Sequence, residues 1–122
     1  MFDRDDDEFS QDEIVSMVRK FEEAREKDIQ AFFDHSAFEY IIDYYEDQRE
    51  YLRALEAADA GLDQYPYSSS LLTKKAQLLA EERRYDEASE ILDKAEALDP
   101  NEVNIYLVRA DVSVWRGDHN LA

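Results

Sequence analysis

Apolar side chains recur at helical spacing along residues 71–100, in two stripes with a polar break between them. The first stripe consists of Leu71, Leu72, Ala76, Leu78 and Leu79. The second consists of Tyr85, Ala88, Ile91, Leu92, Ala95 and Leu98. The break, residues 82–84, offers no apolar side chain to hold a face. This pattern predicts two antiparallel helices, an αα-hairpin, and each stripe needs the other helix and a further neighbour to be buried.

The hairpin pattern repeats along the chain at a constant interval. Pro66 and Pro100 are separated by the same interval as Ala54 and Ala88, and Ala122 follows Ala88 at that interval again. Each proline follows a predicted second helix, where its ring and missing N–H prevent further helix. A 34-residue period with two helices per unit predicts an all-α fold, an α-α superhelix (solenoid) of helical hairpins.

This register divides the chain into repeat units and an N-terminal extension. The units cover residues 35–68, 69–102 and 103–122, the last one incomplete. An acidic tail, residues 1–9, and a capping helix, residues 10–34, are predicted to precede them.

The N-terminal helix lies outside the repeat register. Ser10 and Glu13 predict a capping box at its start, and the helix is expected to run to about Phe33. Its apolar residues lie broadly on one face: Ile14, Val18, Phe21 and Phe32. We expect this helix to cover the open apolar edge of the first unit, because terminal repeats need such cover. The alternative is that it lies in the groove of the solenoid as a built-in ligand.

The remaining helices are predicted from the same period. They run from Ala37 to about Gln48, from Tyr51 to Gln64, and from about Glu102 to Trp115. The first of these is expected to turn Phe38, Ile41, Ile42 and Tyr45 toward the core. Gly117 is expected to stop the last helix, and Asp118 to cap one more.

At this point the residues resemble the tetratricopeptide repeat family over about residues 35–122. The best-matched segment, Arg83 to Pro100, is similar to that family's second helix, and the residues at the family's positions are Tyr85, Ala88, Ala95 and Pro100. The first unit offers Tyr51, Ala54, Gly61 and Pro66, and the third offers Arg116, Gly117, Asp118 and Ala122. The resemblance implies a right-handed superhelix that binds other proteins. The family's usual apolar residue in the first helix is Ile41 in unit one, but Lys75 and Arg109 in the other units.

Composition excludes several classes of protein. The chain has 122 residues, two glycines, two prolines and no cysteine, which suits one helical domain without disulfides or thiolate metal sites. No apolar run approaches the roughly 20 residues that span a bilayer, and the start lacks a secretory signal pattern, so we expect a cytoplasmic protein. With two histidines, no HExxH helix and no glycine-rich phosphate loop, we expect no enzyme activity, no cofactor and no metal.

The net charge of −17 is spread unevenly. Residues 1–65 carry 7 basic and 20 acidic side chains, whereas residues 66–122 carry 7 and 11. A strongly negative surface repels nucleic-acid phosphates and anionic lipids, so neither is an expected partner. It attracts basic proteins or peptides, although the same charge can serve solubility alone.

The resemblance also implies a concave groove lined by the first helix of each unit. Carried over position by position, its residues are Glu39, Tyr40, Asp43, Asp47, Thr73, Lys74, Gln77, Glu81, Leu107, Asp111 and Trp115. Family members that clamp a peptide's C-terminal carboxylate use lysines and asparagines there, whereas unit one offers Glu39 and Asp43. The resemblance thus implies a groove for a neutral or basic segment, with Tyr40 or Trp115 as aromatic anchors. The alternative is a solvated acidic face without a ligand.

We therefore expect a protein–protein interaction scaffold or adaptor that binds a peptide or helix. The alternatives are a regulatory or targeting arm of an enzyme whose catalytic domain lies beyond Ala122, and an acidic nucleic-acid mimic. Because the chain stops inside the third unit, we expect a fragment of a longer repeat protein. Its unpaired helix 102–115 is expected to expose Ile105, Val108 or Val112, and to be marginally stable or to pair two copies through this edge.

Overall fold

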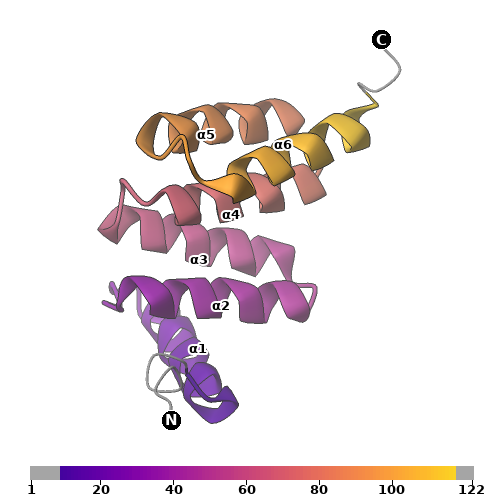
Figure 1. The fold of residues 1–122 in the computed structure, drawn as a ribbon. Coiled ribbons are helices and arrows are strands. Elements are labelled where there is room, and N and C mark those ends of the chain that lie inside the picture. Colours follow the sequence, from indigo (N-terminus) through magenta and orange to yellow (C-terminus); the bar gives the residue numbers. More distant parts are fainter. Residues whose placement is uncertain (1–8, 118–122) are drawn as a thin grey trace.

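A computed structural model describes residues 9–117, which form an all-α solenoid (Figure 1). The helices are α1 (Gln11–Glu26), α2 (His35–Asp47), α3 (Tyr51–Gln64), α4 (Ser69–Glu81), α5 (Tyr85–Leu98) and α6 (Val103–Arg116). Each helix contacts the next one along the chain, and α6 also contacts α4. The predicted repeat of helical hairpins is confirmed. The acidic tail except Phe9, and the predicted cap at Asp118, lie outside the described residues.

The repeat period is visible in how the first helix of each unit ends. Helices α2, α4 and α6 are each followed by a residue in the left-handed region, Arg49 (φ 61°), Arg83 (φ 64°) and Gly117 (φ 86°). After α4, the N–H of Arg84 donates back to the carbonyl of Leu79 at 2.9 Å. This closure satisfies a free carbonyl at the helix end and reverses the chain into the second helix.

Of these three left-handed positions, the one after α6 is occupied by glycine, and the ones after α2 and α4 are occupied by arginine. An L side chain in this region costs about 1–2 kcal/mol through the contact of Cβ with the following carbonyl. Replacing Arg83 with glycine is therefore expected to raise the free energy of unfolding by about 0.5–1 kcal/mol, after the greater chain entropy of unfolded glycine is subtracted. Urea denaturation measures this difference.

The matched control is the neighbouring Glu82, which has φ −90°. Glycine at position 82 removes no strain, so it is expected to lower stability by about 0.5 kcal/mol. A loss of stability in both variants would contradict the proposed strain at Arg83.

Helix α1 begins as predicted but ends earlier. Ser10 Oγ accepts from the N–H of Glu13 at 3.2 Å, and the Glu13 carboxylate accepts from the N–H of Ser10 at 2.8 Å, so the capping box is confirmed. The expected end near Phe33 is wrong. Asp28 has φ 56°, and a hydrogen bond of 2.9 Å from Ile29 to Ala24 closes the helix after Glu26. Residues 27–34 form a connection instead.

The early end of α1 changes the surroundings of Phe32. This side chain was expected on the apolar face of the helix, but it follows the helix and is 76% exposed. The residues of α1 that are buried are Val18, Phe21 and Ala24.

Helix α1 is held against the first hairpin by apolar and polar contacts. It lies beside α2 at one end of the stack (Figure 1). The hydroxyl of Tyr45 in α2 donates to Glu22 of α1 at 2.7 Å, and Arg53 of α3 donates to the same carboxylate oxygen at 3.0 Å. Both the burial of Tyr45 and its contact with Glu22 raise the pKa of its hydroxyl. These contacts place α1 at the outer edge of unit one.

The predicted apolar stripes form the core, with one exception. Phe38, Ile41, Ile42 and Tyr45 are all buried, as are the five residues of the first stripe of the central hairpin. In the second stripe, Leu98 is exposed. It is the last residue of α5, where the chain leaves the helix toward Pro100, and it borders an open hollow beside Leu62 and Leu72.

Lys75 and Arg109, which stand where the tetratricopeptide family usually has an apolar residue, both form ion pairs. Lys75 Nζ lies 2.8 Å from Asp59, and Arg109 lies 2.8 Å from Asp93, one period later in the chain. Each pair joins the first helix of one unit to the second helix of the preceding unit. Because the carboxylates are exposed, each pair contributes no more than about 1 kcal/mol, and its main effect is on helix register.

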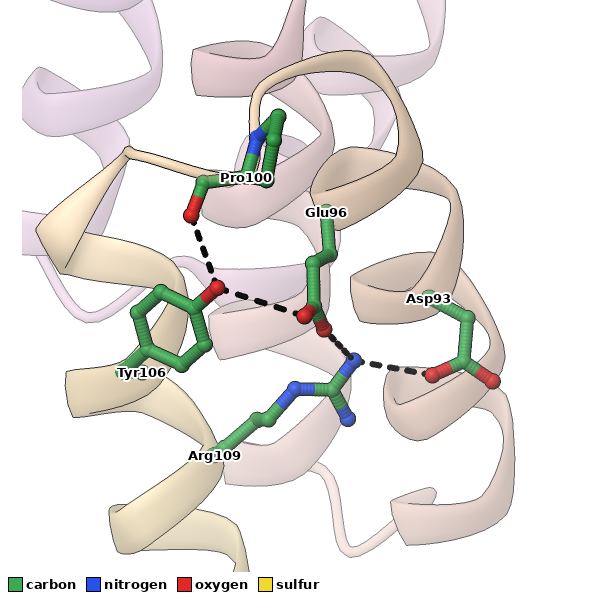
Figure 2. Close-up of polar contacts among 5 residues, drawn as sticks. All are labelled: Asp93, Glu96, Pro100, Tyr106 and Arg109. Atoms are coloured by element: carbon green, nitrogen blue, oxygen red, sulfur yellow. Dashed lines mark hydrogen bonds and ion pairs between the residues drawn. The ribbon is translucent and has the colours of Figure 1, made fainter.

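Where α5 contacts α6, the pair of Arg109 and Asp93 belongs to a larger polar cluster, shown in Figure 2. Arg109 also donates to Glu96 at 2.9 Å, and the hydroxyl of Tyr106 lies 3.2 Å from Glu96 and 2.7 Å from the carbonyl of Pro100. The cluster fixes the rotation of α6 on α5.

That rotation overturns the expectation for the apolar residues of α6. Ile105, Val108 and Val112 are buried against α4 and α5 rather than exposed. The large apolar side chains that α6 exposes are Val103, Tyr106, Leu107, Val114 and Trp115.

Candidate binding groove

The first helices of the three units line a common groove of about 650 Å³. Eight of the eleven predicted residues lie in it: Glu39, Tyr40, Asp43, Thr73, Lys74, Gln77, Leu107 and Asp111. They come from α2, α4 and α6, and α1 contributes no lining residue. The groove is thus built by the first helices of the units, the helices that the family resemblance implies for it.

Three predicted residues lie outside the groove, and they occupy one equivalent position. Asp47, Glu81 and Trp115 are one repeat period apart, in the last turns of α2, α4 and α6. The groove is confined to the earlier turns of these helices. Glu81 and Trp115 line a second hollow beside Tyr51 and Tyr85, and Asp47 is exposed and lines neither hollow. Trp115 therefore cannot act as an anchor in the groove.

The groove also contains residues that the sequence did not predict. Ser36, Ser70 and Asn104 occupy another equivalent position, about one turn before the predicted residues, and Glu102 and Val108 complete the lining. The serine and asparagine positions could have been predicted from Glu39, Thr73 and Leu107, because residues three or four positions apart share a helix face.

The groove is strongly negative. Its carboxylates are Glu39, Asp43, Glu102 and Asp111, and among its lining residues the cation is Lys74. Lys74 Nζ already lies 2.8 Å from Asp43. This pair neutralises one carboxylate, and the charge of the other carboxylates favours a positively charged guest.

Hydrogen bonds hold part of this lining in place before any partner binds. Ser70 Oγ donates to Glu39 at 2.6 Å, and the Glu102 carboxylate accepts from the N–H of Asn104 at 3.1 Å at the start of α6. The Tyr40 and Phe9 rings pack edge-to-face, with centroids 5.2 Å apart. The Glu39 and Glu102 carboxylates and the Tyr40 ring are therefore oriented in advance, which lowers the entropy lost when a partner binds.

Two carboxyl groups approach each other beyond the end of the groove. Burial first, and then the Glu46 carboxyl, raise the pKa of Glu81 to about 7. Burial and the nearby Asp43 also raise the pKa of Glu46, although Lys74 opposes that change. Within residues 9–117, Glu81 Oε1 is buried without a hydrogen-bond partner. A proton held between the two carboxyls would supply this bond, because like charges at close range resist joint ionisation.

Comparison with known proteins adds no family assignment. No protein-family model matches the chain, and no curated protein matches its sequence. In the part of the chain that the structure describes, no three His, Asp or Glu side chains gather as metal ligands would. Over the same residues, no helix is both long and apolar enough to cross a membrane.

Proposed function

We propose that this protein is an interaction scaffold or adaptor of the tetratricopeptide type, which binds a basic or neutral peptide segment of a partner protein in the groove. The observation that carries the proposal is the groove itself. The same four positions of three consecutive first helices line it, and it holds four carboxylates against one lysine that is already paired. Such a surface recognises the shape and charge of a segment rather than performing chemistry on it.

The lining suggests how a partner segment would be held. Lysine or arginine side chains would meet Glu39 and Asp111 at opposite sides of the groove, while an apolar side chain would contact Tyr40 or Leu107. Apolar contact supplies affinity, and the charges steer association and select the partner. The acidic remainder of the surface, with a net charge of −17, assists steering at low ionic strength.

The test uses an array of synthetic peptides of about 12 residues, each with one leucine or tyrosine and from none to about four lysines. Affinities of the best binders are then measured by fluorescence polarisation for the unchanged protein and for Glu39→Gln/Asp111→Asn. We expect this double variant to bind about fivefold more weakly, since each exposed charge pair contributes roughly 0.5 kcal/mol.

The matched control neutralises two exposed carboxylates away from the groove, Glu23→Gln/Glu90→Gln. It changes net charge by the same amount and is expected to leave the affinity within about twofold of the unchanged protein. Equal weakening in both variants would mean that overall charge and not the groove binds the peptides. No binding by any peptide of the array would also overturn the proposal, whereas best binding by the peptides without lysine would assign the groove to neutral segments.

A further inference from the structure

The hollow that Leu98 borders lies on the opposite side of α4 from the groove. On α4 it is lined by Leu72 and Lys75, whereas the groove is lined by Thr73 and Gln77. At about 100° per residue, these two pairs lie on opposite sides of the helix. The hollow has a volume of about 460 Å³, and we call it the leucine hollow after Leu62, Leu72 and Leu98. A segment bound there leaves the groove free.

The lining of the leucine hollow is mostly apolar. Besides the three leucines it contains Pro66, Tyr67, Ile91 and Ala97, and two lysines supply its charge. Tyr67 is 80% exposed and Leu98 is 45% exposed. None of the described residues that line it is acidic, although 31 of the 122 residues of the chain are Asp or Glu. Apolar side chains gathered in an open hollow with few polar groups are typical of a binding site.

The same place one repeat later is filled by polar groups of the chain itself. Glu96 and Tyr106 stand there, one period after Leu62 and Leu72. Figure 2 shows that the Glu96 carboxylate accepts a hydrogen bond from Arg109, with the Tyr106 hydroxyl 3.2 Å away. Leucine side chains make no such bonds, so the apolar surface of the leucine hollow stays open.

The leucine hollow lies inside the stack of helices and not at its edge. Helices α3, α4 and α5 form it, and each of them contacts one helix before it and one after it. Its opening is therefore a property of the junction between two full hairpins.

The two lysines of the hollow differ in what they contact. Lys75 is paired with Asp59 at 2.8 Å. Lys94 is exposed and forms no ion pair with a described residue, Glu90 one turn earlier included. At physiological salt the Debye length is about 8 Å, so the distant acidic surface is screened, whereas a carboxylate in contact with Lys94 is not. The hollow thus favours a guest that is apolar with an acidic group beside it.

We propose that the leucine hollow binds a short acidic segment of a partner protein. The segment inserts a leucine or phenylalanine side chain among the leucines and places a neighbouring carboxylate on Lys94. This site goes beyond the proposed groove function, because the two sites select opposite charges on opposite sides of α4. One chain is then able to hold two different partners. The contact area is small, so the binding is weak and reversible.

Synthetic peptides of about 10 residues test the site by fluorescence polarisation at physiological salt. The probe has one central leucine flanked by glutamates. One matched peptide has alanine at the centre, and another has lysines in place of the glutamates. We expect the probe to bind, and each matched peptide to bind at least fivefold more weakly, because each lacks one of the two features that the hollow selects.

A charge reversal locates the acidic contact. Lys94→Glu is expected to weaken binding of the probe about fivefold, because an attractive contact becomes a repulsive one. Lys20→Glu changes the net charge by the same amount at an exposed position of α1, and should leave the affinity within about twofold.

A second variant gives the hollow the residue of the next junction. Leu62→Glu introduces the equivalent of Glu96 at a half-buried position and is expected to weaken binding of the probe at least tenfold. Leu52→Glu, at an exposed leucine of the same helix, is the matched control and should bind normally. Circular dichroism checks that both variants are folded. The proposal would be overturned by no binding of the probe, by equal binding of a matched peptide, or by unchanged binding to Lys94→Glu or to folded Leu62→Glu.

Discussion

Replacing Phe38 with alanine is expected to lower the free energy of unfolding by about 3–5 kcal/mol. Phe38 is fully buried in α2, and its ring packs edge-to-face with the rings of Phe33 and Tyr65, with centroids 5.5 and 6.3 Å away. The substitution removes both ring contacts and leaves a cavity where helix α3 comes closest. Because domains of this size are stable by only about 5–15 kcal/mol, a large share of the molecules should unfold on mild heating. Urea denaturation followed by circular dichroism measures the loss.

Gly61 of α3 lies close to the Phe38 ring, so a substitution there gives a second test of the cavity. A Cβ at position 61 would lie 3.1 Å from Cγ of Phe38 and 3.2 Å from Cδ1 of Leu71, so these side chains would have to move by a few tenths of an ångström to admit it. In the Phe38→Ala background, Gly61→Ala is expected to recover about 1 kcal/mol, because the methyl group enters the cavity and alanine favours the helix.

A surface aromatic serves as the control for the size of the effect. Phe32 is 76% exposed, and its replacement by alanine should change the free energy of unfolding by less than about 0.5 kcal/mol. Similar losses at positions 32 and 38 would contradict the described core. So would a Gly61→Ala effect that is the same with and without the Phe38 ring.

Replacing Glu81 with glutamine is expected to stabilise the protein by about 1–2 kcal/mol at pH 8.5, and to have little effect at pH 5. The pKa of Glu81 is raised from its ordinary value of 4.5 to about 7 by burial and by Glu46. At pH 8.5 the unchanged protein must ionise both carboxyls at close range, whereas glutamine stays neutral and can donate a hydrogen bond to Glu46. Thermal unfolding at the two pH values measures the difference.

The sign follows from proton linkage. Between pH 4.5 and about 7 the folded protein retains the Glu81 proton that the unfolded chain has released, so the free energy of unfolding falls as the pH rises through this range. The Glu81→Gln variant should lose this part of the slope. Glu82→Gln changes the neighbouring exposed carboxyl and is expected to keep the slope unchanged. A slope that survives in Glu81→Gln would show that another group is responsible.

Local rules account for what the sequence predicts well. Helix α3 is predicted over Tyr51–Gln64 and is found there, because its start and its end before Pro66 are both decided within a few residues of the chain. The capping box of Ser10 and Glu13 is equally local. The sequence does not predict the end of α1, because Asp28 takes the left-handed conformation that glycine favours, and no glycine stands there.

For the groove, too, one part is predicted before the structure is known and another part is not. The family resemblance implied its three helices, and eight of the eleven residues carried over from that resemblance lie in it. How far the groove extends along each helix was not determined by periodicity. Asp47, Glu81 and Trp115 lie on later turns than the groove reaches, since that length depends on how neighbouring helices diverge.

The sequence by itself determined that the chain is all-α, that its hairpins recur with a constant period, and which stripes form most of the core. Helix spacing and capping are local properties, so a short stretch of sequence is enough to predict them. The tertiary structure alone decided which side of α6 is buried and that Glu46 of α2 meets Glu81 of α4. Both depend on the rotation of one packed helix against another. That rotation is set by all the contacts between the helices together, and no short stretch of sequence contains them.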